Sequence, residues 1–283
     1  MTEPDGGGAA KRPQPLRIET PALSPEASRQ MYKAMEKSLR ELWGVVDGLA
    51  AVMPPRPTYY RVTIFGSSRM HAGDALYLEV RRLALELAAM GCDIITGGGP
   101  GLMQAANEGE LLGDVTNRTY SIGLNVELPH EQAPNPFVEV LYHHGTFFSR
   151  LHHFVQLSSA FVVMRGGIGT TLEALMVWQL CQVGHLKRRP LIMVGGMWPD
   201  LVEWGRKHWL SDEGNLADPD DLEIPFCVET VDEAVALIKQ NHRRYAKRQY
   251  TWFRHQIDGS VYETTDELIP VLSRKLEAWG RHY

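Results

Sequence analysis

Two glycine-rich segments constrain the fold of this chain more than any other feature. Residues 165–173 read RGGIGTTLE and follow the apolar run 160–164, and residues 96–103 read TGGGPGLM and follow the short strand-like run 93–95. Each segment opens a helical pattern, and N–H groups at a helix start lack intrahelical acceptors and attract anions. Glycine also lets a phosphate approach the backbone closely. We predict that both loops lie at the carboxyl edge of one parallel sheet, where ligands of such sheets bind.

The rest of the core alternates between strand-like and helix-like patterns. The expected strands are 61–65, 93–96, 120–125, 138–142, 160–164, 190–194 and 226–228. The expected helices are 75–90, 103–112, 146–158, 171–183, 199–209 and 231–244. This alternation predicts an α/β fold, a doubly wound parallel sheet with helices on both faces.

Composition limits the class of protein. The 283 residues are 44% hydrophobic and 22% charged, as in ordinary globular proteins, and the net charge of −5 gives no whole-chain attraction for nucleic acid. The three cysteines, Cys92, Cys181 and Cys227, are isolated, which fits a reducing cytoplasm. No apolar run approaches the roughly 18 residues that span a bilayer, and the N-terminus lacks a signal-peptide pattern. We expect a cytoplasmic protein with no membrane partner and no nucleic-acid partner.

Three motifs resemble those of the Lonely Guy family, which contains cytokinin-activating phosphoribohydrolases and bacterial nucleoside 5′-monophosphate nucleosidases, many once labelled lysine decarboxylases. The motifs are GGGPGLMQAANEG at 97–109, SIGLNVELPHEQAPNP at 121–136 and GGIGTTLEA at 166–174. The resemblance spans about residues 58–240 and is greater to the longer bacterial branch. It implies a Rossmann-like fold, a homodimer or higher homo-oligomer, and no metal or other cofactor. It also implies hydrolysis of AMP or an N6-modified AMP to free base and ribose 5-phosphate.

Two positions depart from the family pattern. Arg165 stands where the family has a proline before the glycine pair, and the family's Arg-Lys pair is Arg150-Leu151 here. Arg165 places a cation beside the phosphate loop, which bears on substrate choice. The arginine that the resemblance implicates in catalysis is kept.

The resemblance implies two catalytic residues, Glu173 and Arg150. Glu173 would stabilise the oxocarbenium-like state at the anomeric carbon or activate the attacking water, and we expect its place near a helix start to keep it ionised. Arg150 would orient Glu173 or contact the nucleotide. The expected substrate- and phosphate-binding residues are Gly166, Gly167, Ile168, Gly169, Thr170, Gly97, Gly98, Gly99, Gly101, Met103, Ser67 and Ser68.

Several residues have a structural alternative. Thr170 and Glu173 have the spacing of a capping box, in which the glutamate bonds back to the helix start. Asn107 and Glu108 match the family pattern but can serve helix or subunit contacts instead. The histidine pairs 143–144 and 152–153 lack a cysteine or carboxylate at ligand spacing, so we predict no metal site.

The segments outside the core are treated separately. We predict a disordered segment over residues 1–23, a helical extension over 24–57, the Rossmann-like nucleotide-binding catalytic domain over 58–244 and a helical extension over 245–283. The stretch RYAKRQYTWFR at 244–254 resembles a short segment of tRNA isopentenyltransferases. The chain has no GxxxxGK[ST] loop, so we do not expect transferase activity. We interpret this stretch as a basic arm docked on the core or on a neighbouring subunit, in preference to an RNA contact.

Three other functions compete with nucleotide hydrolysis. A related Rossmann-like group binds nucleotides or carries molybdenum cofactor without cleavage, and Arg165 keeps that alternative open. Lysine decarboxylation would need pyridoxal phosphate and a Schiff-base lysine, which neither glycine loop contains. An oligomeric scaffold built from the added helices would bind no nucleotide.

Overall fold

The computed structural model describes residues 26, 29, 30, 33, 37, 60–126, 133–186, 189–211 and 214–256. The chain divides into two compact units, residues 57–269 and residues 1–56 with 270–283. In the second unit the five described positions, all between 26 and 37, are helical and exposed. The predicted disordered segment, most of the predicted N-terminal helix and residues 257–283 of the predicted C-terminal extension lie outside the described residues.

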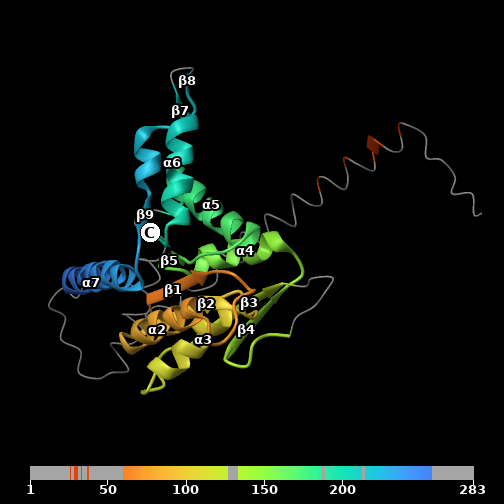
Figure 1. Cartoon of the computed structure of the whole chain (residues 1–283). Coiled ribbons are helices and arrows are strands. Elements are labelled where there is room, and N and C mark those ends of the chain that lie inside the picture. The colour runs from red at the N-terminus through yellow and green to blue at the C-terminus, as the bar shows by residue number, and fades with distance from the viewer. Residues whose placement is uncertain are drawn as a thin grey trace, which may run out of the picture. The chain divides into compact units, whose positions relative to one another are not determined.

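Seven parallel strands form one sheet in the order β4-β3-β2-β1-β5-β6-β9 (Figure 1). The strands are β1 (Tyr60–Phe65), β2 (Cys92–Thr96), β3 (Ser121–Val126), β4 (Val140–His144), β5 (Ala160–Val163), β6 (Leu191–Val194) and β9 (Pro225–Val228). The chain moves outward from β1 to β4 and then crosses to the other side of β1 for β5. This reversal creates a topological switch point between β1 and β5, where doubly wound sheets open a ligand crevice.

Helices cover both faces of the sheet. One face carries α2 (Ala75–Ala89), α3 (Leu102–Gly113) and α7 (Val231–Gln256), and the other carries α4 (Phe147–Leu157), α5 (Ile168–Gln182) and α6 (Met197–Trp209). In β1, Val62 and Ile64 belong to the first core and Phe65 to the second, as the alternation of strand side chains requires. The predicted doubly wound parallel fold is confirmed.

Helices α2 and α3 approach each other closely because two glycines face α2. A Cβ on Gly109 would lie 2.1 Å from the carbonyl oxygen of Arg81, and one on Gly113 would lie 2.2 Å from that of Leu85. Glu108 on the same helix accepts hydrogen bonds from Tyr77 and Arg81, each at 2.8 Å. Glu108 therefore links α3 to α2.

The structure differs from the sequence expectations after α5. A two-stranded hairpin of β7 (Leu210–Ser211) and β8 (Gly214–Asn215) and the 3-10 helix η1 (Pro219–Glu223) follow α6. Strands of two residues are too short to show a periodic pattern. Helix α7 was expected to end at residue 244 but continues without a break to Gln256. Within the described part of the chain, no helix is long and apolar enough to cross a membrane.

Candidate functional site

The loops after β1, β2 and β5 meet at the carboxyl edge of the sheet. Strands β1 and β5 pair up to Phe65 and Val163, so they end at the same level. The Ser67 N–H then donates to the Arg165 carbonyl at 3.2 Å, and the Leu102 N–H donates to the Ser67 carbonyl at 2.9 Å. These backbone bonds join both glycine loops to the loop after β1, at the switch point.

Arg150 connects the two glycine loops. Its Nη2 donates a hydrogen bond to Oε1 of Glu173 at 2.8 Å. A Cβ on Gly97 would lie 3.6 Å from Nη1 of Arg150 and 2.8 Å from Sδ of Met103. The guanidinium therefore lies against the first glycine loop and is bonded to the carboxylate on the helix that follows the second loop. The two residues expected to be catalytic are held together.

Burial dominates the electrostatics of this pair. Each side chain keeps only 12% of its exposure. Burial raises the pKa of Glu173 to about 7, and the charge of Arg150 lowers it by less. Burial also lowers the pKa of Arg150, which the carboxylate opposes. The expectation that the helix start holds the pKa of Glu173 low is not met, because Glu173 lies in the second turn, where the dipole is weak and desolvation is the larger effect.

The capping-box alternative for Glu173 is also wrong. Helix α5 begins at Ile168 with Gly167 at its N-cap, three residues earlier than the alternative requires. Glu173 is therefore beyond the reach of the N-cap N–H. Its carboxylate is bonded to Arg150 instead.

Two aromatic rings flank the Arg150 guanidinium. Its Cζ lies 4.5 Å from the ring centroid of Phe147 and 5.7 Å from that of Phe154. Phe154 is fully buried in the second core and fixes the helix from below. Nε of Arg150 is buried and has no hydrogen-bond partner within the described ranges. Sequence reasoning missed Phe147, although its place three residues before Arg150 on a helix puts it on the same face.

The first glycine loop is held by a buried amide network. Thr96 Oγ1 accepts from the Gly98 N–H at 2.9 Å and donates to Asn107 Oδ1 at 2.7 Å. Asn135 Nδ2 donates to Asn107 Oδ1 at 3.0 Å and to the Gly99 carbonyl at 2.9 Å. The N–H groups of Gly98 and Leu102 are thus already used within the protein. Asn107 shapes the loop, and Asn135, which follows β3, was not identified from the sequence as a site residue.

The second glycine loop is open. Gly167, Ile168 and Gly169 are exposed, and the Ile168 side chain is 91% exposed. First-turn N–H groups have no intrahelical acceptor, so this helix start presents donors to an anion. Thr170 differs from expectation, because it is buried and a Cβ on Gly166 would lie 2.2 Å from its Oγ1. The Thr170 hydroxyl therefore packs beneath the loop.

The remaining expected residues lie around these loops. Ser67 is half-buried and Ser68 is exposed, and both contact the first loop, since a Cβ on Gly101 would lie 2.5 Å from each of their main chains. Gly101 has φ of 73°, a conformation that favours glycine. Arg165 is exposed, and its side chain lies over Gly195 in the loop after β6, where a Cβ would be 3.3 Å away. It borders the open loop.

One histidine from each of the two pairs bonds to the other. Nε2 of His144 and Nδ1 of His153 lie 3.1 Å apart, and burial lowers the pKa of His153 to about 4. Across the described residues, no group of three or more histidine, cysteine or acidic side chains has the arrangement of a metal site.

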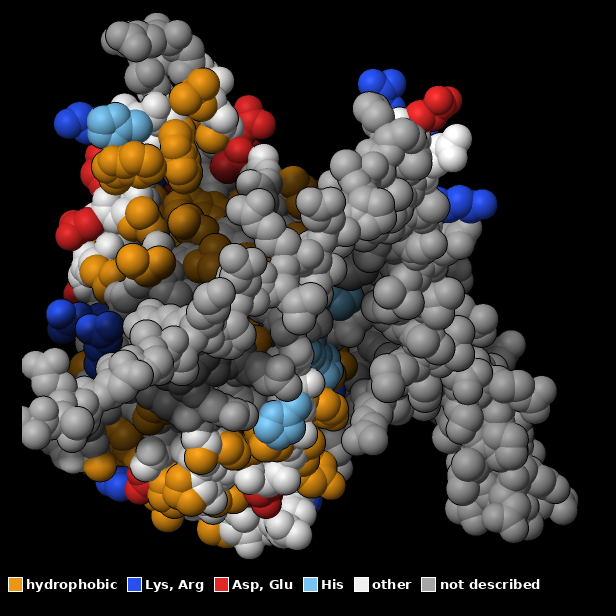
Figure 2. All heavy atoms as spheres, turned by 90° about the vertical axis from the view of Figure 1, so that its right-hand side faces the viewer, with side chains coloured by type: hydrophobic (Ala, Val, Ile, Leu, Met, Phe, Trp, Pro, Cys, Tyr) orange, Lys and Arg blue, Asp and Glu red, His pale blue; other side chains and the backbone are white. Residues whose placement is uncertain are grey.

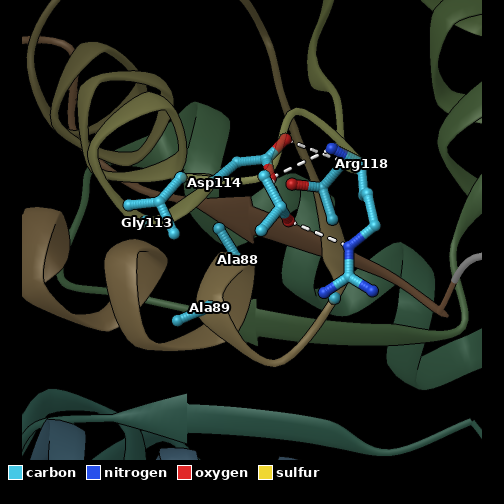
Figure 3. Close-up of a pocket in the computed structure, with 9 residues that line it drawn as sticks. Ala88, Ala89, Gly113, Asp114 and Arg118 are labelled. Carbon is cyan, nitrogen blue, oxygen red and sulfur yellow. Dashed lines mark hydrogen bonds between the residues drawn. The ribbon is translucent and has the colours of Figure 1, made fainter.

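A pocket lies at the opposite edge of the sheet, where α2 and α3 end (Figure 3). Asp114 accepts hydrogen bonds there from the N–H groups of Arg118 and Thr119, at 3.0 and 2.8 Å. The carboxylate is used to close the turn after α3. This pocket contains none of the expected site residues.

Together, the doubly wound sheet, its topological switch point and the exposed helix start at the second glycine loop define a Rossmann-like domain. Residues 103–238 match the family model described as possible lysine decarboxylase, the former label of the Lonely Guy family. This segment therefore belongs to the Lonely Guy family, as its motifs predicted.

The other similarities are to parts of the chain. Residues 223–256 match the family model described as IPP transferase. The tRNA dimethylallyltransferase of Anoxybacillus flavithermus is 52% identical over 40 residues, which are 14% of this chain and 13% of that enzyme. The chain thus spans about an eighth of the length of this relative. The short resemblance seen at 244–254 is confirmed.

Two of the similar solved structures are described as molybdenum cofactor proteins. The carrier protein of Chlamydomonas reinhardtii is 18% identical with a TM-score of 0.48, over 66% of this chain and 99% of that one. The cofactor-binding protein of Rippkaea orientalis is 16% identical with a TM-score of 0.48, over 65% of this chain and 98% of that one. These likenesses concern the fold alone.

Proposed function

We propose that this protein hydrolyses the N-glycosidic bond of a nucleoside 5′-monophosphate, AMP or an N6-modified AMP, in the cytoplasm. The observation that carries the proposal is the position of Arg150, bonded to Glu173 and lying against the first glycine loop. The catalytic domain would be residues 58–244. Glu173 lies on the helix that begins at the second glycine loop, and the Arg150 side chain links its buried carboxylate to the first glycine loop.

The chemistry follows from the state of Glu173. A carboxyl group with a pKa of about 7 exchanges its proton readily at neutral pH, which suits a general base. In its ionised form it would take a proton from water while the water oxygen bonds to C1′. The bond from C1′ to the base nitrogen breaks through an oxocarbenium-like state, and the base nitrogen takes a proton from solvent as it leaves. Ribose 5-phosphate remains, and Glu173 returns its proton to solvent.

We assign the 5′-phosphate to the second glycine loop. Its exposed first turn offers N–H donors, whereas the N–H groups of Gly98 and Leu102 at the first loop are already bonded. Glycine positions 167 and 169 have no atom within 4 Å of a built Cβ, which leaves open space above the loop. We therefore expect the first loop, with Met103, to face the ribose and base.

We also propose a homodimer that uses the outer face of α5. Ile168, Leu172 and Leu175 are exposed at spacings of four and three residues, so they form one apolar stripe. Figure 2 shows hydrophobic side chains gathered in the upper part of the face it presents, where α5 and α6 lie in Figure 1. An exposed stripe of this kind favours a subunit contact.

The test is chromatography of purified protein incubated with AMP, isopentenyl-AMP or adenosine. We expect free base from the nucleotides, little from adenosine, and a loss of about 100-fold or more in the Glu173→Gln variant. The matched control is Glu108→Gln, which breaks an Arg–Glu pair of the same 2.8 Å length between α2 and α3. Equal release by wild type and Glu173→Gln would remove the carboxylate from the mechanism.

Binding of nucleotide without release of base would instead support a carrier or sensor, the alternative that Arg165 keeps open. Decarboxylation is not proposed, because neither glycine loop contains a lysine. Transfer of a prenyl group is not proposed either, because the similarity to such enzymes is confined to a short segment.

A further inference from the structure

Helix α7 contains a long stretch without acidic residues. Between Glu233 and Asp258 the sequence has no aspartate or glutamate. The same stretch contains six cationic residues, Lys239, Arg243, Arg244, Lys247, Arg248 and Arg254. This concentration of positive charge occurs in a chain whose net charge is −5.

The apolar side of α7 is used by the core. Val231, Val235 and Ile238 are buried in the first core, beneath the sheet face that α2 also covers. Tyr60 continues the contact, because its hydroxyl donates to Asn241 Oδ1 at 2.6 Å and its ring centroid lies 5.5 Å from that of Tyr245. The helix is therefore anchored over four turns, and the direction of its outer side is fixed.

The cations lie on that outer side. Arg243, Arg244, Lys247 and Arg248 are exposed, and none forms an ion pair with a described residue. Earlier on the helix, Lys239 lies 3.9 Å from a Glu86 oxygen. The exposed cations form two like-charged pairs at a spacing of four residues, which weakens an isolated helix. An anionic partner would relieve this repulsion.

We propose that this face of α7, the basic face (Arg243, Arg244, Lys247, Arg248), binds the phosphodiester backbone of a single-stranded nucleic acid. Side chains four residues apart on a helix lie about 6 Å from each other, close to the distance between successive phosphates of a strand. Tyr250 is exposed one turn beyond Lys247 and offers a ring on which a base can stack. This interaction goes beyond nucleotide hydrolysis and uses a different surface.

A lipid surface fits this helix less well. An interfacial helix places its apolar side in the bilayer, and the apolar side of α7, with Val235 and Ile238, is buried in the protein. One side of α7 is thus docked, as the sequence interpretation expected, and the other side presents cations that form no ion pair with the residues the structure describes.

The experiment measures fluorescence anisotropy of labelled 16-nucleotide RNA and DNA strands of one sequence with the full chain. The test variant is Arg243→Gln/Arg244→Gln/Lys247→Gln. The control variant, Arg118→Gln/Arg206→Gln/Lys207→Gln, removes the same charge from exposed positions elsewhere. We expect binding that weakens with salt, at least a tenfold loss in the test variant, and a salt slope lower by about 2.

Comparing the affinities for the RNA and the DNA strand shows which kind of nucleic acid the basic face prefers. Equal binding of RNA and DNA supports recognition of the backbone, and tighter binding of RNA supports an added 2′-hydroxyl contact. Failure to bind either strand, equal weakening by the control variant, or binding only to vesicles of anionic phospholipid would each overturn the proposal. Release of base from AMP should be unchanged in the test variant. A failure of the nucleic-acid proposal is therefore distinguishable from a failure of the proposed hydrolysis.

Discussion

At the scale of single residues, the pairing of Arg150 with Glu173 sets the pH dependence of the proposed reaction. The pKa of Glu173 is raised to about 7 by burial and lowered by Arg150. If ionised Glu173 is the active form, kcat/KM rises with pH through an acid limb near pH 7. In Arg150→Met the limb should move up by about 1 pH unit or more, because the stabilising charge is gone. An unchanged limb in a pH–rate profile would show that another group controls it.

Phe147 holds the Arg150 guanidinium at 4.5 Å from its ring centroid, whereas its neighbour Phe148 is 77% exposed. Phe147→Leu removes a cation–π contact of about 1 kcal/mol, so kcat/KM should fall about fivefold. Phe148→Leu is the matched control and should retain wild-type kinetics. Phe147→Tyr keeps the ring and should restore activity; a loss as large as in Phe147→Leu would argue against ring stacking.

At the scale of elements, the second glycine loop contains glycines with two different roles. A Cβ on Gly166 would lie 2.2 Å from Oγ1 of Thr170, while one on Gly169 meets nothing within 4 Å. Gly166→Ala should therefore destabilise the start of α5, by about 1–3 kcal/mol in thermal unfolding. Gly169→Ala should leave the fold as stable as wild type but weaken AMP binding in calorimetry, because its Cβ enters the space assigned to the phosphate. If Gly169→Ala lost stability and Gly166→Ala lost only AMP binding, the phosphate would not lie above Gly169.

The apolar stripe on the outer face of α5 forms the contact of the proposed dimer, so a charge placed in it tests the dimer. Leu172 is exposed and lies on the stripe with Ile168 and Leu175. Leu172→Lys should shift the mass in sedimentation or light scattering toward the monomer, because a charge enters an apolar contact. Val115→Lys is the control, since Val115 is 90% exposed in the turn after α3. A monomeric wild type, or an unchanged mass in Leu172→Lys, would exclude this interface.

At the scale of the whole molecule, local patterns predicted the sheet and the long-range contacts decided the details. The strand and helix patterns predicted β1 to β6, β9 and α2 to α7 nearly to the residue at most ends, because buried parallel strands are short apolar runs. The site was predicted as two loops with Arg150 and Glu173. Sequence patterns did not show that Glu173 is desolvated, that Thr170 faces inward or that Asn135 supports the first loop. The desolvation of Glu173 and the role of Asn135 depend on residues 23 to 36 positions apart packing together, and Thr170 packs against Gly166, four residues before it.

The free energy of unfolding should depend on pH through a second buried carboxyl group, that of Glu110. Glu110 is fully buried, and its pKa is raised to about 7, chiefly by burial, while Oε1 accepts from Thr119 at 2.7 Å. A carboxyl group with a raised folded-state pKa holds its proton longer than in the unfolded chain. Its contribution to the free energy of unfolding therefore falls as pH rises from about 4.5 to about 7. Glu110→Gln should remove up to about 3 kcal/mol of the difference between pH 5 and pH 8 in chemical denaturation. Glu79→Gln, at an exposed position of α2, should behave as wild type. If both variants retain the wild-type difference, Glu110 is ionised at no cost in the fold, and Asp93, Asp114 and Glu139 do not raise its pKa.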